Sequence, residues 1–216
     1  MPRNNLVMKH SRAWLAVLIV LAVLIIDQLI KIWVKTHMFW GEDIEVLPWF
    51  HLRFVQNNGM AFGMEFGSKL FLSLFRVVAV AGLIWVLYRL CKDNGRKLLV
   101  CLSLVTAGAA GNIIDCLFYG EIFNNPYPPE IASFVPWGEG YSSLFHGLVV
   151  DMFYFPLFSF EWPDWMPWLG GRSFSFFDPV FNFADAAISV GMVVLILFYS
   201  KYLGGSEKRI EEKVDE

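Results

Sequence analysis

Charged residues are scarce in this sequence, which limits the class of protein it can encode. Of its 216 residues, 17% are charged and 56% are hydrophobic, and the mean hydropathy is +0.51. A soluble domain of this size has a more polar composition. The composition therefore predicts an integral membrane protein, and the net charge of −3 gives no reason to expect a nucleic-acid partner.

The motifs of several common hydrolases are also absent. The three cysteines, Cys91, Cys101 and Cys116, show neither paired nor metal-ligand spacing, which predicts buried free thiols. The chain contains no Gly-x-Ser-x-Gly and no His-Glu-x-x-His sequence. Aspartates alone would make a weak metal site without nearby histidine or cysteine. We therefore expect no metal and no other cofactor.

Four apolar runs are each long enough to cross a bilayer, which takes about 20 residues. They cover approximately residues 13–34, 68–90, 98–118 and 179–202. The first run follows basic residues, as a signal peptide does. It is longer than the usual apolar region of a signal peptide and lacks a convincing cleavage site, so we interpret it as a retained anchor.

Basic residues are unevenly distributed between the runs. Residues 119–178 contain a single basic residue, Arg172, whereas the link 89–97, the N-terminal segment and the C-terminal tail each contain several. The positive-inside rule then places both termini and this link in the cytoplasm, and the loops 35–67 and 119–178 outside.

With that orientation, the ionisable groups of the runs gather at the outer membrane surface. Asp27 and Lys31 lie one helical turn apart near the end of the first run, Asp115 closes the third run and Asp185 opens the fourth. The spacing of Asp27 and Lys31 predicts a local ion pair, or alternatively a role in orienting a neighbouring loop.

The start of the fourth run places three polar residues on one helical face, Asn182, Asp185 and Ser189. In the third run, Asn112 and Asp115 are three residues apart, as Asn182 and Asp185 are. They follow a series of small residues that allows another helix to approach closely. A charge in hydrocarbon costs at least about 2.5–3.5 kcal/mol, so it usually faces a protein interior or a water-filled cavity. The alternatives are a carboxylate that reaches the headgroups and asparagines that hydrogen-bond between helices.

The two outer loops differ in character. In the first, residues 50–56 alternate as a β-strand does, and Asn57-Asn58-Gly59 is a turn signal, which predicts a small antiparallel element. The second is rich in aromatic residues and proline, and its tryptophans at positions 162, 165 and 168 are typical of the headgroup interface. Within it, Asp151 is the one acid of an apolar run over residues 147–155.

Two kinds of chemistry fit a set of acids at one membrane surface. A pair of close aspartates cannot both ionise and can share a proton while activating water. A proton or ion relay is the non-enzymatic alternative, but a relay needs acids at several depths in the membrane. The position of the acids favours the aspartate pair.

Five short motifs follow one another along the chain. They are Asp27-Gln28-x-x-Lys31, Asn57-x-Gly59-x-Ala61-Phe62-Gly63, Gly108-Ala109-Ala110-Gly111-Asn112-x-x-Asp115, Val149-Val150-Asp151-x-Phe153 and Phe181-Asn182-x-Ala184-Asp185-x-x-Ile188-Ser189. With the four apolar runs, this order resembles the lipoprotein signal peptidases, the type II signal peptidases of bacteria. The resemblance covers most of the chain.

The resemblance implies a single integral membrane peptidase domain over residues 1–216. Its fold would be an all-α, four-helix transmembrane bundle with a small extracytoplasmic β-cradle built from the first loop and aromatic-rich outer loops. The implied activity is that of an aspartyl endopeptidase of the bacterial inner membrane. It would remove the signal peptide of diacylglyceryl-modified prolipoproteins on the amino side of the lipidated cysteine.

The family's catalytic pair falls on Asp151 and Asp185. The supporting residues fall on Asn57, Gly59, Asn112, Asp115, Asn182, Asp27 and Lys31. The resemblance also implies contact with membrane lipids and with globomycin-type inhibitors, and we expect a monomer.

The sequence departs from the family pattern in two respects. Cys116 stands where the family usually has an arginine, so an ion pair made by that arginine is either absent or supplied from elsewhere, with Arg53 and Arg172 as candidates. Residues 119–147 and 158–177 are longer than the usual connections of the family.

Overall fold

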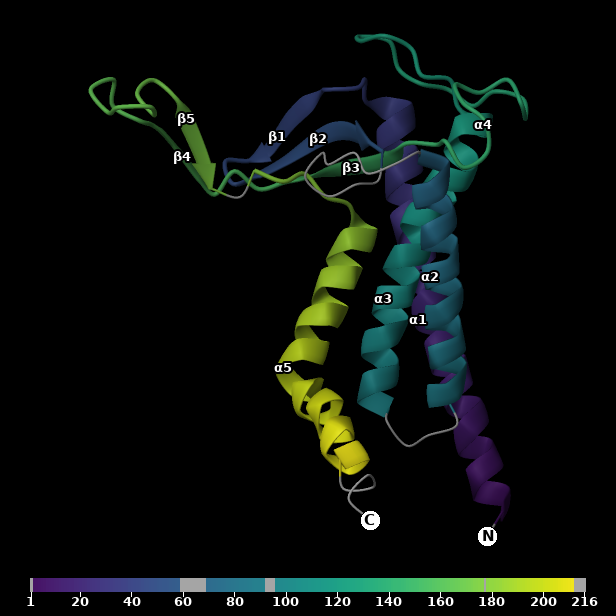
Figure 1. Ribbon diagram of the computed structural model, residues 1–216. Helices are drawn as coiled ribbons and strands as arrows, with labels where there is room; N and C mark the ends of the chain where they lie inside the picture. The colour runs from purple at the N-terminus through teal and green to yellow at the C-terminus, as the bar shows by residue number, and fades with distance from the viewer. Residues whose placement is uncertain (1, 59–68, 92–95, 177, 212–216) are drawn as a thin grey trace. The chain divides into compact units, whose positions relative to one another are not determined.

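The computed structural model describes residues 2–58, 69–91, 96–176 and 178–211 (Figure 1). The chain divides into two compact units. The first comprises Met1–Ile26, Arg76–Gly111 and Ala184–Glu216, and the second comprises Asp27–Phe75 and Asn112–Phe183.

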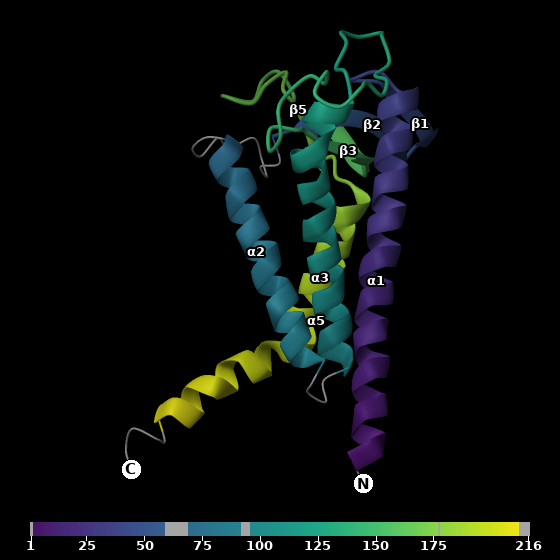
Figure 2. The same ribbon diagram turned by 90° about the vertical axis from the view of Figure 1, so that its right-hand side faces the viewer.

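Four long helices provide most of the described structure. They are α1 (Pro2–His37), α2 (Lys69–Leu90), α3 (Arg96–Ile114) and α5 (Phe183–Glu211). Figure 2 shows α1 and α3 running side by side. In the first unit, Ala16 of α1, Leu87 of α2 and Leu99 of α3 form a small buried cluster.

The outer surfaces of these helices are apolar. Large side chains such as Leu18, Trp85 and Phe198 are mostly exposed. Exposed apolar surface of this extent is typical of a protein that contacts other apolar matter, here lipid. The prediction of an integral membrane protein therefore agrees with the structure.

Three of the described helical segments are long and apolar enough to cross a membrane. They are Ser11–His37, Lys69–Leu90 and Lys97–Ile122. The fourth predicted run coincides with α5, whose apolar part, Phe183–Phe198, is shorter. The prediction of several apolar helices is confirmed, whereas a count of four membrane crossings is not.

Small residues bring α3 and α5 close together within the first unit. A Cβ atom on Gly108 would overlap the carbonyl oxygen of Ala184 and lie 2.7 Å from Cγ1 of Ile188. A Cβ atom on Gly191 would lie 2.7 Å from Cγ2 of Val105. The small-residue series therefore packs against another helix, as the sequence predicts.

The second unit contains a three-stranded antiparallel sheet in the order β1 (Asp43–Leu47), β2 (Phe50–Asn57), β3 (Val149–Tyr154). The strand predicted over residues 50–56 is confirmed as β2. The expectation that the first loop builds the β-cradle is confirmed for β1 and β2, whereas β3 comes from the second loop. Of the turn predicted at Asn57-Asn58-Gly59, Gly59 lies outside the described residues.

A buried apolar cluster supports the sheet. It joins the end of α1 to β2, β3 and the chain after α3, through Val34, Met38, Phe54, Tyr119, Phe123, Val150 and Met152.

A π-helical turn, η2 (Asp115–Tyr119), continues α3, and the short α4 (Gly120–Ile122) follows it. Gly147 lies against this turn, and its N–H donates to the carbonyl oxygen of Cys116 at 2.9 Å. A Cβ atom on Gly147 would overlap the carbonyl oxygen of Asp115. Glycine at this position therefore lets the second outer loop reach the end of α3 just before it forms β3.

A separate two-stranded hairpin, β4 (Phe158–Glu161) with β5 (Ser173–Phe176), follows β3. Figure 1 shows it beyond the end of β3 and away from the three-stranded sheet. Three tryptophans of the second outer loop, Trp162, Trp165 and Trp168, lie between the two strands of this hairpin.

Candidate active site

Lys31 of α1 lies between two carboxylates. Its Nζ is 3.0 Å from Oδ2 of Asp27, one turn earlier, and 2.8 Å from Oδ2 of Asp115 at the start of η2. All three side chains are fully buried. The predicted ion pair between Asp27 and Lys31 is confirmed, and Asp115 is a second partner that sequence spacing did not reveal.

Gln28 connects the two acids by hydrogen bonds. Its Nε2 donates to Asp27 at 3.2 Å and to Asp115 at 2.9 Å, and its Oε1 accepts from the Tyr119 hydroxyl at 3.1 Å. The backbone N–H of Val150 in β3 donates to Asp115 at 3.3 Å. Buried ionised groups are tolerated only when hydrogen bonds satisfy them in this way.

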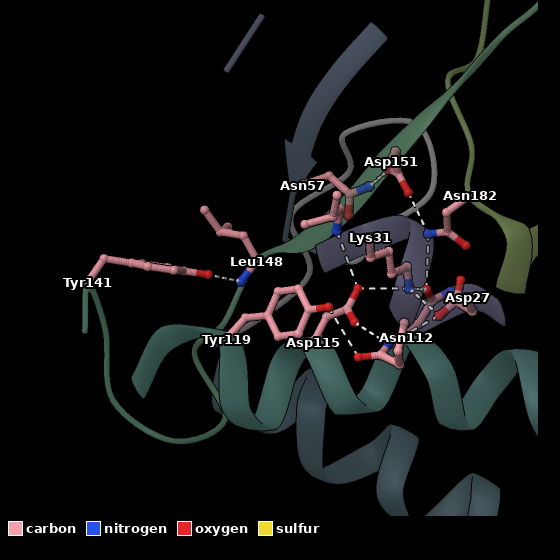
Figure 3. Close-up of polar contacts among 12 residues, drawn as sticks. Asp27, Lys31, Asn57, Asn112, Asp115, Tyr119, Tyr141, Leu148, Asp151 and Asn182 are labelled. Atoms are coloured by element: carbon pink, nitrogen blue, oxygen red, sulfur yellow. Dashed lines mark hydrogen bonds and ion pairs between the residues drawn. The ribbon is translucent and has the colours of Figure 1, made fainter. Parts of the chain in front are cut away.

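The network continues from Lys31 to Asp151 through two asparagines. Oδ1 of Asn112 accepts from Lys31 Nζ at 2.8 Å and from Asn182 Nδ2 at 3.1 Å. Nδ2 of Asn182 also donates to Oδ1 of Asp151 at 2.6 Å. An unbroken series of polar contacts thus joins α1, the end of α3, the chain before α5 and β3 (Figure 3).

Asp151 is positioned by strand register. Val55 of β2 pairs with Asp151 of β3. Asn57 lies two residues further along β2, so its side chain is on the same face of the sheet as Asp151 and is the diagonal neighbour of Asp151. The Asn57 amide donates to Oδ2 of Asp151. With Asn182 on Oδ1, each carboxyl oxygen accepts an amide N–H, which fixes the orientation of the group.

The segment before α5 adds itself to the far edge of β3. Phe153 and Phe181 exchange backbone hydrogen bonds at 2.8 and 3.0 Å, forming an isolated antiparallel bridge. This bridge places Asn182 beside Asp151, which is 3% exposed. Of the predicted site residues, Asp27, Lys31, Asn57, Asn112, Asp115, Asp151 and Asn182 therefore lie in one network.

The structure does not describe how two other predicted site residues relate to that network. Gly59 falls outside the described residues. Asp185 lies in the first turn of α5, where an acidic side chain is stabilised by the helix N-terminus, and it is partly exposed. Asp185 belongs to the first unit and Asp151 to the second, so their pairing stays a prediction.

The cation beside Asp115 is Lys31. Whether the ion pair of the family arginine is absent here or comes from Arg53 or Arg172 stays a prediction. The Arg53 guanidinium lies over the Tyr154 ring, 5.4 Å from its centroid. All three cysteines are free thiols, as predicted, and Cys101 and Cys116 are buried, whereas Cys91 is only half-buried.

Lys35, one turn beyond Lys31, is a buried group that sequence reasoning missed. Its Nζ has no hydrogen-bond partner among the described residues and lies 5.1–5.9 Å from the ring centroids of Phe54, Phe123 and Tyr141. Burial raises the pKa of Tyr141, so this phenol stays neutral, and its oxygen accepts the Leu148 N–H at 2.6 Å. The aromatic cage is attractive to a cation.

Within the described residues, no group of three or more histidine, cysteine, aspartate or glutamate side chains could hold a metal ion. The hydrogen-bond donors around Asp151 are amides, which orient a carboxyl group. The arrangement can hold one carboxyl group in a fixed, nearly dry position.

Lys31→Met and Lys35→Met give a matched test of this network. Lys31→Met removes the cation between two buried carboxylates, and breaking a buried ion pair costs about 3–5 kcal/mol. Lys35→Met keeps the apolar stem and removes an ammonium that has no hydrogen-bond partner in the described part of the chain, so its effect on stability should be small. Thermal unfolding in detergent measures both, and equal losses of stability would contradict the assignment of Lys31 as the central cation.

Comparisons with known proteins identify the family. The family model described as Signal peptidase (SPase) II matches residues 19–201. Over 188 residues, the chain is 54% identical to the lipoprotein signal peptidase of Porphyromonas gingivalis, covering 86% of this chain and 82% of that protein. It is 38% identical over 195 residues to the lipoprotein signal peptidase of Amoebophilus asiaticus, covering 87% and 78% respectively.

A solved structure described as a bacterial membrane enzyme has the same fold, with a TM-score of 0.57. It is 24% identical and covers 84% of this chain and 85% of that one. The fold agrees with the sequence comparisons, and on the match over residues 19–201 and the 54% identity the chain belongs to the signal peptidase II family of membrane peptidases.

Proposed function

We propose that this protein removes the signal peptide of diacylglyceryl-modified prolipoproteins, cutting on the amino side of the lipidated cysteine. Membership of the signal peptidase II family supports the reaction class, and the relatives are named lipoprotein signal peptidases. The observation that carries the proposal is the position of Asp151, a buried acid whose two oxygens are each held by an asparagine amide.

In this proposal, Asp151 and Asp185 form the catalytic pair. Asn182, which holds Asp151, lies three residues before Asp185 in the sequence. The ionised member of the pair takes a proton from a water molecule, and the protonated member donates to the oxygen of the scissile carbonyl. The resulting hydroxide attacks the carbonyl carbon, and proton transfer to the amide nitrogen releases the signal peptide.

The other polar residues hold this pair in place. Asn57 and Asn182 orient Asp151, and Asn112 links Asn182 to Lys31. Asp27 and Asp115 fix Lys31 from opposite sides. These are positioning roles, since none of these residues takes part in the proton transfers.

We place the protein in the bacterial inner membrane as a four-helix bundle with both termini in the cytoplasm. The loops 35–67 and 119–178 are then outside, with the active site near the outer surface. The basic-residue asymmetry of the sequence supports this orientation. The protein works as a monomer and binds membrane lipids and globomycin-type inhibitors.

Cleavage of a lipidated prolipoprotein peptide by the purified protein tests the proposed chemistry. Asp151→Asn and Asp185→Asn keep the size of the side chain but remove the exchangeable carboxyl group, so each should lower kcat about 10²–10⁴-fold or more. The double variant should be little worse than either single variant, because the pair acts as a unit. Activity should survive EDTA.

Control variants separate a direct role in catalysis from a role in holding the site together. Asp164→Asn changes an exposed acid of the hairpin loop and should retain full activity. Asp115→Asn should lower thermal stability together with activity. Near-normal turnover of Asp151→Asn would show that the catalytic pair is assigned to the wrong residues, and proton flux through vesicles without cleavage would favour an ion relay.

The orientation is tested by cysteine labelling from each side of the membrane. In a background without native cysteines, Asn94→Cys should react with an impermeant reagent only from the cytoplasmic side, and Glu139→Cys only from outside. Glu139 is exposed, so the reagent can reach that position. Labelling of Asn94→Cys in intact cells would invert the proposed topology.

A further inference from the structure

The β4–β5 hairpin has one aromatic face. Phe158 pairs with Phe176 and Phe160 with Phe174 across the two strands, and their ring centroids are 4.9 and 5.1 Å apart. Trp162 packs edge-on against Phe160, with centroids 4.9 Å apart. Because alternate residues of a strand point to the same side, these five rings form one surface, called here the aromatic face.

The aromatic face lies uncovered among the described residues. The rings of Phe158 and Phe176 are about half exposed, and at the hairpin tip Trp165 is 79% and Trp168 is 92% exposed. A two-stranded hairpin by itself is marginally stable in water. A contiguous, exposed apolar surface of this kind marks a contact with another apolar body.

The positions that alternate with the aromatic face are polar. Glu161 pairs with Ser173 at the tip-proximal end of the hairpin. The loop between the strands is closed by its own backbone, because Trp162 donates to the Arg172 carbonyl at 2.9 Å and Gly171 donates to the Trp162 carbonyl at 3.0 Å. The hairpin is therefore an amphipathic, internally hydrogen-bonded element that needs an apolar surface on one side only.

We propose that the aromatic face and the tip tryptophans insert into the interfacial layer of the outer leaflet, between headgroups and acyl chains. The apolar segment Phe183–Phe198 begins shortly after β5 ends at Phe176, so the hairpin is continuous with the chain's entry into the membrane. Tryptophan and phenylalanine are the residues favoured at this depth. A hairpin also satisfies its own backbone groups across the strands, which an interfacial element requires.

The charged residues of the hairpin indicate which lipid headgroups it would contact. The hairpin and its loop contain Glu161 and Asp164 against the single basic residue Arg172. Attraction to anionic lipids requires a cluster of basic residues, which is absent from residues 158–176 of the sequence. Insertion is therefore driven by apolar burial, works with zwitterionic lipids and is insensitive to salt.

Anchoring the hairpin has a consequence for the site. β3 ends at Tyr154 and β4 begins at Phe158, so a hairpin held in the interface tethers the strand that contains Asp151. Given the proposed function, this keeps Asp151 at the level where the diacylglyceryl group of a substrate meets the headgroups. The inserted hairpin would thus favour lipidated substrates presented in a bilayer.

Depth measurements with nitroxide spin labels test the insertion. Phe160→Cys and Glu161→Cys are neighbours on opposite faces, so each is the matched control of the other in a background with Cys91, Cys101 and Cys116 replaced by alanine. In phosphatidylcholine vesicles, power saturation should show the label at position 160 more accessible to oxygen than to a water-soluble nickel chelate. The label at position 161 should show the reverse, and raising the salt concentration should change neither.

Other outcomes would overturn the proposal. Chelate accessibility at both positions would place the hairpin in water, and protection of position 160 from both reagents would mean that protein, such as a second copy of the chain, covers the aromatic face. Phe174→Cys with Ser173→Cys repeats the test on β5 if a β4 variant fails to fold, as judged by thermal unfolding in detergent.

A kinetic comparison tests the consequence for the substrate. Phe160→Ser with Phe174→Ser should raise KM for a lipidated peptide in vesicles several-fold and leave kcat unchanged. A loss confined to kcat would contradict the tethering role. Failure of the proposed peptidase activity would leave no cleavage in the parent protein, whereas the spin-label depths are measured without substrate, so the two failures are distinguishable.

Discussion

The site depends on one buried cation, Lys31, held between two carboxylates. Removing these charges from water is costly, and the cost is offset only because Asp27 and Asp115 lie within 3.0 Å of the ammonium and further donors surround them. An arrangement with so many satisfied contacts has few alternatives of similar energy. Lys31 therefore fixes the end of α1 against the start of η2 in a single geometry.

Hydrogen bonds connect Lys31 to the three-stranded sheet and so position the sheet relative to it. Asn112 binds Lys31 and Asn182 at the same oxygen, and Asn182 binds Asp151. The backbone of Val150 contacts Asp115 directly. Because Lys31, Asp115 and Asn182 are fully buried, water does not compete with the contacts. The candidate catalytic acid is thus positioned by a charge on a different element.

The sequence predicted those features that depend on residues close together in the chain. The Asp27–Lys31 pair follows from one helical turn, and β2 follows from its alternation. The Lys31–Asp115 pair could not be predicted, because it joins residues far apart in the chain. β3 gave no alternating signal, since Val149 to Met152 are all buried, and an apolar run of that length does not distinguish a strand from a helix. The burial of Lys35 was not predicted, because a lysine near the end of a helix is usually exposed.

The central claim is that Asp151 is positioned by Lys31 through Asn112 and Asn182. A double-mutant cycle on kcat/KM, with Asn112→Ala, Asn182→Ala and the double variant, tests it most directly. Since both asparagines belong to one series of contacts, the first substitution should already lose most of the effect, giving a coupling energy of about 0.5–3 kcal/mol. Losses that simply add would contradict the account, because they would mean that the two asparagines act on catalysis independently.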